Sequence, residues 1–207
     1  MSKIEWTEKT WNPIHGCTKV SEACENCYAE VMAKRLQGNH IKSYENGFAV
    51  TRNIDAMKEP YKWQKPTMVF VVSMGDLFHN AVPDEWINPI MRVIEKTPQH
   101  TYQLLTKRPW NMEEYFLRHP VPKNVWLGTM CENRRHYDRI DALRDIKCNN
   151  VKFISCNNKW RKRAMVTIEK RIYNPQTGRK AQAEAGEAKD LEILASDKRT
   201  EWNIHLL

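Results

Sequence analysis

Residues 67–76 read TMVFVVSMGD, an apolar run of five residues that ends in polar ones. Short apolar runs rich in β-branched and aromatic side chains are typical of strands buried on both faces. Three similar runs follow, at 101–106 (TYQLLT), 124–129 (NVWLGT) and 151–155 (VKFIS). We therefore predict four buried strands.

Between these runs lie stretches with apolar residues at helical spacing, at 83–96, 110–117 and 134–146. Strand and helix in alternation predict a parallel sheet, and a further strand near residues 10–12 brings the count to about five β/α units. On the residues alone, this sheet is either open or rolled into a barrel. In both arrangements the chemistry lies at the carboxyl ends of the strands.

The composition excludes several classes of protein. Eight Trp, seven Tyr and five Phe are too many for a disordered chain. No apolar run approaches the ~18 residues of a membrane span, and no apolar signal segment opens the chain, so we expect a cytoplasmic protein without a membrane partner. Dinucleotide-fold (GxGxxG), P-loop and HExxH motifs are missing from the sequence.

The positive charge is concentrated late in the chain. The formal net charge is +8, and residues 157–180 carry eight basic side chains against one acidic one. Such a segment can attract nucleic-acid phosphates, although a solvated surface is the simpler interpretation. We expect two parts, residues 1–156 as a partial β/α barrel and residues 157–207 as a basic tail.

The strongest chemical signal is the spacing Cys17-x6-Cys24-x2-Cys27. Thiols at this spacing in a reducing compartment indicate an inorganic centre rather than disulfides. Zinc normally takes four protein ligands, which His15 or His79 could complete. A [4Fe–4S] cluster on three cysteines keeps one iron without a protein ligand. Spacing alone leaves both alternatives open.

Several motifs in sequence order give a resemblance to a known family. These are the opening SKIEWTEKTWNPIHGC, then CENCYAE at 24–30, VSMGDLFH at 72–79, LTKRP at 105–109 and VWLGTMCEN at 125–133. With them the chain resembles the DUF5131 (phage Gp37/Gp68) family, which is similar to radical SAM enzymes of the spore photoproduct lyase type. The resemblance runs from Ser2 to about Cys156.

The resemblance implies an α/β fold of the radical SAM type, a partial (β/α) barrel. It implies a [4Fe–4S] cluster on Cys17, Cys24 and Cys27 that binds S-adenosylmethionine and generates a 5′-deoxyadenosyl radical. The substrate is unidentified, with nucleic acid among the candidates. By strand order, the candidate cofactor-binding residues are Ser73, Gly75 and Asp76 for the methionine moiety, and Lys107 and Glu132 for its carboxylate or the ribose.

The resemblance also implies a reductant protein as partner and, for a phage-encoded chain, the host cytoplasm as location. After Cys156 the sequence departs from the family pattern, because no Gly-Gly follows, and we expect a chain truncated at its C-terminus. The alternatives are a zinc-stabilised nucleic-acid-binding protein without catalysis and an inactive, truncated family member. The oligomeric state and the substrate have no signature in the sequence.

Overall fold

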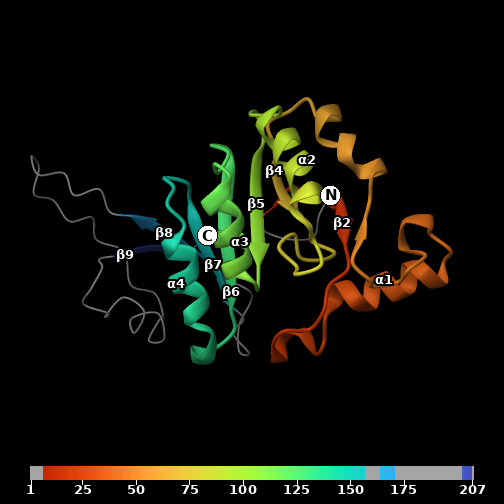
Figure 1. Cartoon of the computed structure of the whole chain (residues 1–207), viewed down its shortest axis with the longest axis horizontal. Coiled ribbons are helices and arrows are strands. Elements are labelled where there is room, and N and C mark those ends of the chain that lie inside the picture. The colour runs from red at the N-terminus through yellow and green to blue at the C-terminus, as the bar shows by residue number, and fades with distance from the viewer. Residues whose placement is uncertain (1–6, 157–163, 171–201, 207) are drawn as a thin grey trace, which may run out of the picture.

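The computed structural model describes residues 7–156, 164–170 and 202–206. Its main sheet has seven strands in the order β1-β4-β5-β6-β7-β8-β9 (Figure 1). The first five strands are parallel to their neighbours: β1 (Lys9–Trp11), β4 (Met68–Val71), β5 (Thr101–Thr106), β6 (Val125–Cys131) and β7 (Lys152–Cys156). The prediction of an α/β fold with about five parallel strands is confirmed.

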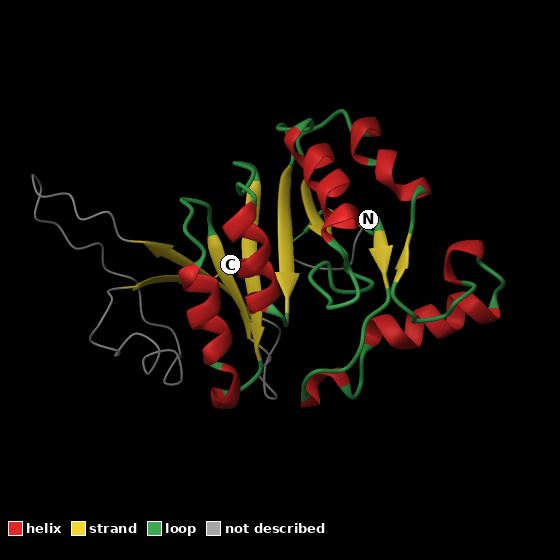
Figure 2. Ribbon diagram, viewed as in Figure 1, coloured by secondary structure: helices red, strands yellow, loops and turns green. Residues whose placement is uncertain are grey.

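The connections between the parallel strands all step in one direction along the sheet. Each strand pairs with the next parallel strand of the chain, so right-handed crossovers put every connecting helix on the same face. Figures 1 and 2 show those helices in front of the sheet. They are α2 (Asp84–Glu95), α3 (Pro109–Arg118) and α4 (Asp138–Asp145). The sheet is therefore singly wound, whereas doubly wound sheets reverse direction.

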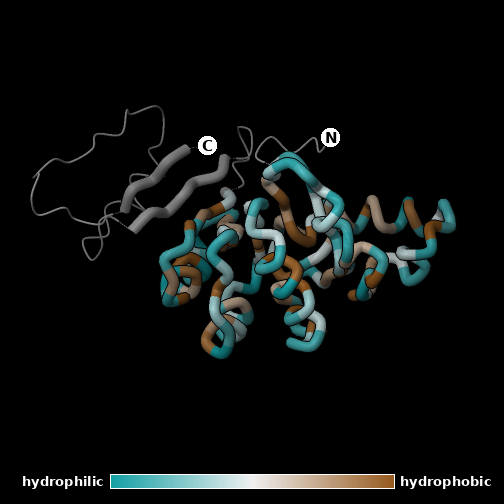
Figure 3. Tube along the Cα trace, turned by 90° about the horizontal axis from the view of Figure 1, so that it is seen from above, coloured by the Kyte–Doolittle hydropathy of each residue, from teal (hydrophilic) through white to brown (hydrophobic). Residues whose placement is uncertain are grey.

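The core lies between the sheet and these helices. Alternate strand residues such as Leu104 and Leu127 face Ile94 of α2 and Leu143 of α4, and all four are at most 1% exposed. Figure 3 shows the trace from above, with apolar stretches in brown among hydrophilic ones in teal. Burial of these side chains, worth about 1.5–3 kcal/mol each, fixes the strand register and with it the position of every strand end.

Two predicted elements have boundaries that differ from the expectation: one strand ends early, and one helix begins late. The apolar run of residues 68–72 forms a strand only as far as Val71, because Val72 has a left-handed backbone (φ 58°) that turns the chain. The helix predicted over 134–146 begins as the 3-10 turn η5 (Arg134–His136), since the Asn133 side chain accepts a hydrogen bond from the Arg135 amide and α4 starts only at Asp138.

The segment after Cys156 extends the sheet, for which the sequence carries no clear pattern. β8 (Ala164–Lys170) pairs antiparallel with β7, and β9 (Trp202–Leu206) pairs antiparallel with β8. Most of the basic stretch 157–180 lies outside the described residues. None of the helices described here is both long and apolar enough to cross a bilayer.

A smaller unit fills the connection between β1 and β4. It contains α1 (Tyr28–Gly38), the two-stranded ribbon of β2 (Ile14–His15) and β3 (Thr51–Arg52), and the 3-10 turns η1 (Glu22–Cys24), η2 (Lys42–Tyr44), η3 (Asp55–Lys58) and η4 (Pro60–Lys62). Figure 1 shows α1 beside the lower end of the sheet, where the parallel strands end. This unit carries all three clustered cysteines.

Candidate functional site

The chain leading to Cys17 is held backbone to backbone against the end of β4. The Val72 amide donates to the Trp11 carbonyl at 2.7 Å, and the Gly16 amide donates to the Met74 carbonyl at 2.9 Å. Gly16 has a φ of 90°, and a Cβ there would lie 2.1 Å from the Ala49 carbonyl oxygen, so only glycine fits. This path places Cys17 at the carboxyl edge of the sheet.

The three clustered cysteines are free thiols on one loop, residues 17–27, which we call the cysteine loop. Cys24 ends η1, and Cys27 is the N-cap of α1. Helix α1 begins only at Tyr28, because residues 22–24 form a 3-10 turn and Cys27 is extended. The N-terminal end of α1 therefore adjoins Cys27.

Cys17 lies beside a buried ion pair. Arg108 Nη1 lies 3.4 Å from Cys17 Sγ and 3.0 Å from Asp76 Oδ2. The other guanidinium nitrogen, Nη2, donates to the Thr18 carbonyl at 3.1 Å and to its hydroxyl at 2.9 Å. Asp76 and Arg108 are only 5% and 7% exposed, so the loop rests on a charge pair that water barely reaches.

Cys24 lies beside a second ion pair. Lys107 Nζ lies 3.3 Å from Cys24 Sγ and 3.2 Å from Glu132 Oε1. Glu132 also accepts from Ser21 Oγ at 2.5 Å and from Arg139 Nη1 at 2.8 Å. Each of these two cysteines thus lies beside a cation that is itself paired with a carboxylate, and these charged groups follow β4, β5 and β6.

The two thiols have opposite pKa shifts. Burial, together with the Asp76 carboxylate, raises the pKa of Cys17 in spite of Arg108. Burial also acts to raise the pKa of Cys24, but a backbone hydrogen bond from Val20, the Ser21 hydroxyl and the Lys107 ammonium outweigh it and lower the pKa. Cys24 is therefore the more readily ionised of the two.

A further set of polar contacts ties the cysteine loop to the start of η5. Glu22 accepts from Asn133 Nδ2 at 3.1 Å and lies 3.1 Å from His136 Nε2. The pKa of Glu22 is lowered to about 2 by its own backbone amide and by these two side chains. With the Ser21–Glu132 bond, these contacts hold the loop over the ends of β5 and β6.

Of the two histidines considered as zinc ligands, His79 is hydrogen-bonded to the chain, whereas both ring nitrogens of His15 are buried without a hydrogen-bond partner among the described residues. His79 Nδ1 accepts from the Ala81 amide at 3.0 Å, and its Nε2 lies 2.8 Å from Thr18 Oγ1. His15 is 1% exposed and packs on Tyr44 with ring centroids 4.4 Å apart. Among the described residues, no group of three or more His, Cys, Asp or Glu side chains is close enough to hold a metal ion.

The structure brings together Asp76, Lys107 and Glu132 of the expected cofactor-binding residues. Ser73 instead donates to the Asn12 side chain at 3.2 Å, and Gly75 lies against the backbone of Gly16. Cys27 packs against a small apolar cluster that includes Met74 and Tyr44.

Sequence reasoning left Arg108, Thr18, Ser21 and Arg139 out of the site. A signal existed for Arg108, because two adjacent cations directly follow a buried strand. The other three have no signal, since ordinary loop and helix positions carry the same residue types.

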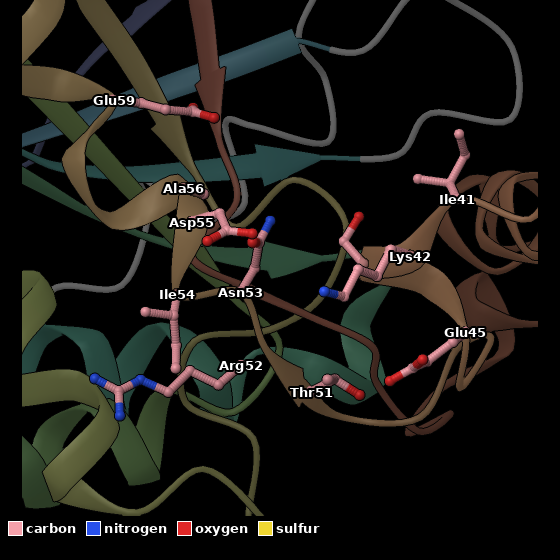
Figure 4. A pocket seen from close by; sticks show the side chains of 11 residues that line it. Ile41, Lys42, Glu45, Thr51, Arg52, Asn53, Ile54, Asp55, Ala56 and Glu59 are labelled. Carbon is pink, nitrogen blue, oxygen red and sulfur yellow. The ribbon is translucent and has the colours of Figure 1, made fainter.

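A separate open pocket of about 540 Å³ lies on the smaller unit, between α1 and β4 in the chain. Figure 4 shows the side chains that line it. Lys42 and Arg52 line it together with the acidic Glu45, Asp55 and Glu59. This mixture of charges selects no single class of ligand. None of the cysteines lines the pocket.

The fold and the site define an α/β protein with a singly wound parallel sheet and a cysteine loop over its carboxyl edge. The chain belongs to the DUF5131 family, described as proteins of unknown function, whose model matches residues 1–183. No curated protein and no solved structure gives a significant match.

Proposed function

We propose that this chain is an iron–sulfur enzyme of the radical SAM type on a partial β/α barrel. Cys17, Cys24 and Cys27 would hold a [4Fe–4S] cluster, and S-adenosylmethionine would bind beside it. The observation that carries the proposal is the position of three free thiols on one loop over the strand ends, with cations 3.3 and 3.4 Å from two of the sulfurs.

The donor set fits such a cluster chemically. Cysteine thiolates are the usual ligands of iron–sulfur clusters, and hydrogen bonds to their sulfurs tune the reduction potential. Lys107 and Arg108 provide two such donors, and Cys27 lies at the N-terminus of α1. When bound, the cluster supplies the electron that cleaves S-adenosylmethionine to methionine and a 5′-deoxyadenosyl radical.

The roles of the chain's own side chains follow from their charge and position. Lys107 would neutralise the carboxylate of S-adenosylmethionine, and Glu132 would accept hydrogen bonds from its ribose hydroxyls. Ser73 and Gly75 would line the methionine moiety at the end of β4. Because Lys107 and Glu132 now bond Cys24 and Ser21, the cofactor would have to exchange these contacts for its own.

The proposal extends to location and partners. The chain would act in the cytoplasm, that of the host for a phage protein, and would take its electron from a reductant protein. The basic segment 157–180 makes nucleic acid the first substrate class to test.

Anaerobic reconstitution with iron and sulfide tests the cluster. We expect about four irons per chain, brown absorbance in the visible and an EPR signal on reduction, as a [4Fe–4S] cluster requires. Cys24→Ala should lose most of the iron, whereas Cys148→Ala, a partly buried cysteine in the turn before β7, should keep it. Formation of 5′-deoxyadenosine from S-adenosylmethionine and dithionite then tests the reaction.

Two results would overturn the proposal. A colourless protein with one zinc per chain would favour the zinc-stabilised nucleic-acid-binding alternative. A cluster-loaded protein that yields no 5′-deoxyadenosine with any nucleic acid or peptide present would indicate an inactive family member.

A further inference from the structure

Lys107 and Arg108 are adjacent in the chain but point to opposite neighbours of their strand. β5 lies between β4 and β6, and both residues directly follow it. Lys107 bonds Glu132, which follows β6, whereas Arg108 bonds Asp76, which follows β4. Because the two side chains diverge, Lys107 lies beside Cys24 and Arg108 lies beside Cys17.

Arg108 makes more contacts with the cysteine loop than Lys107 does. It reaches the Cys17 sulfur and both oxygens of Thr18, and it lies 7% exposed. Asp76 in turn accepts from the Phe78 amide, the Thr106 hydroxyl and Arg108, so this carboxylate is occupied by the chain itself. Asp76 therefore acts through Arg108 instead of facing a ligand.

We propose that Arg108, which pairs with Asp76, is a positioning residue with two roles. It fixes residues 17–20 of the cysteine loop, and it compensates the negative charge of the bound cluster beside Cys17. This inference rests on the proposed function for its second half. The first half, the fixing of the loop, concerns the protein without any cluster.

The physical argument combines geometry and charge. A guanidinium is planar and donates in two directions at once, so one group can hold a sulfur and the following peptide together. A reduced cluster carries one more negative charge than an oxidised one, and a donor beside its sulfur stabilises that charge most where water is excluded. Arg108 meets both conditions.

The first test uses metal-free protein and amide hydrogen exchange. In Arg108→Gln the amides of residues 17–20 should exchange at least tenfold faster than in the unmodified chain, because the contacts to Cys17 and Thr18 are lost. Arg118→Gln is the matched control, an arginine on α3 that pairs with Asp84 and Glu114 far from the cysteines along the chain. Unchanged exchange in Arg108→Gln would refute the fixing of the loop.

The second test uses reconstituted protein and an EPR-monitored redox titration. Arg108→Gln should lower the equilibrium constant for reduction about tenfold, a shift of about 59 mV to more negative potential for a one-electron couple. Arg108→Lys should keep most of the potential, since the charge stays. An Arg108→Gln variant with full iron and the potential of the unmodified chain would refute the charge role.

A third variant covers the case in which Arg108→Gln leaves Asp76 buried without its partner and fails to fold. Asp76→Asn/Arg108→Gln removes both charges together, and its potential should lie between those of the unmodified chain and Arg108→Gln. If the unmodified chain takes up no cluster, the proposed function fails, while the exchange result still decides whether Arg108 fixes the loop.

Discussion

Gly75→Ala tests whether the cysteine loop depends on a close approach of two backbones. A Cβ at Gly75 would lie 2.6 Å from the Gly16 carbonyl oxygen and 3.0 Å from the Gly16 nitrogen. Both neighbours are backbone atoms, so no side-chain rotation can relieve the contact. The two segments must separate by up to about 1 Å to restore ordinary van der Waals distances.

The cost follows from what such a separation breaks. Gly16 donates to Met74 at 2.9 Å and pairs with Gly75 in an isolated bridge, and both contacts lie one residue from Cys17. Insertion of a methyl group into a close-packed site costs about 1–3 kcal/mol. For a chain of this size, each kcal/mol lowers the melting temperature by about 2–4 °C, so we expect a fall of roughly 2–12 °C.

Gly38→Ala is the matched control. Gly38 is the last residue of α1, and a Cβ there would meet nothing within 4 Å. Replacement of a helical glycine by alanine at an unstrained position stabilises by about 0.4–1 kcal/mol. Thermal unfolding followed by circular dichroism compares the variants, and iron content after reconstitution shows whether Gly75→Ala also displaces Cys17. Equal melting temperatures for Gly75→Ala and the unmodified chain would refute the reasoning.

Two further predictions concern the sheet. A Cβ at Gly128 would lie 2.3 Å from the buried Phe153 ring, so Gly128→Ala should lower the free energy of unfolding in urea by about 1–3 kcal/mol. In the double variant, Phe153→Leu should recover part of that loss. Additive losses in the double variant would contradict this explanation. Burial raises the pKa of Tyr102 to about 12, so the folded state favours the neutral phenol. The stability that Tyr102 contributes is complete below about pH 10 and declines between about pH 10 and 12. In Tyr102→Phe the loss of stability over this pH range should therefore be smaller than in the unmodified chain. An identical dependence of stability on alkaline pH in the two proteins would contradict the role of Tyr102.

The strands were predictable because their signal is local. Apolar runs flanked by polar residues mark β4 to β7 to within two or three residues, and burial on both faces of a parallel strand leaves little room for another interpretation. The exact residues at which the strands end depended on backbone conformation, which the composition does not encode. Val72 ends β4 in a left-handed conformation that β-branched residues rarely adopt, while its amide donates to the Trp11 carbonyl.

The site was predictable in its residue types but not in its partners. Cys17 and Cys24 stood out by spacing, and Lys107 and Glu132 by their place after strands. Which cation meets which thiol depends on how the chain turns after β5, where Lys107 reaches toward the end of β6 and Arg108 toward the end of β4. The register of three strands determines that Asp76 meets Arg108, and no local pattern encodes that register.

The order of the site's parts along the chain has a consequence for biosynthesis. The thiols leave the ribosome about 105–115 residues before Glu132, the acid that accepts a hydrogen bond from Ser21. At about 5–20 residues per second, the nascent chain carries them unprotected for roughly 6–23 seconds. During that interval the sulfurs lack the contacts from Lys107 and Arg108 that they have in the folded chain, so oxidants reach them most easily before β6 is complete.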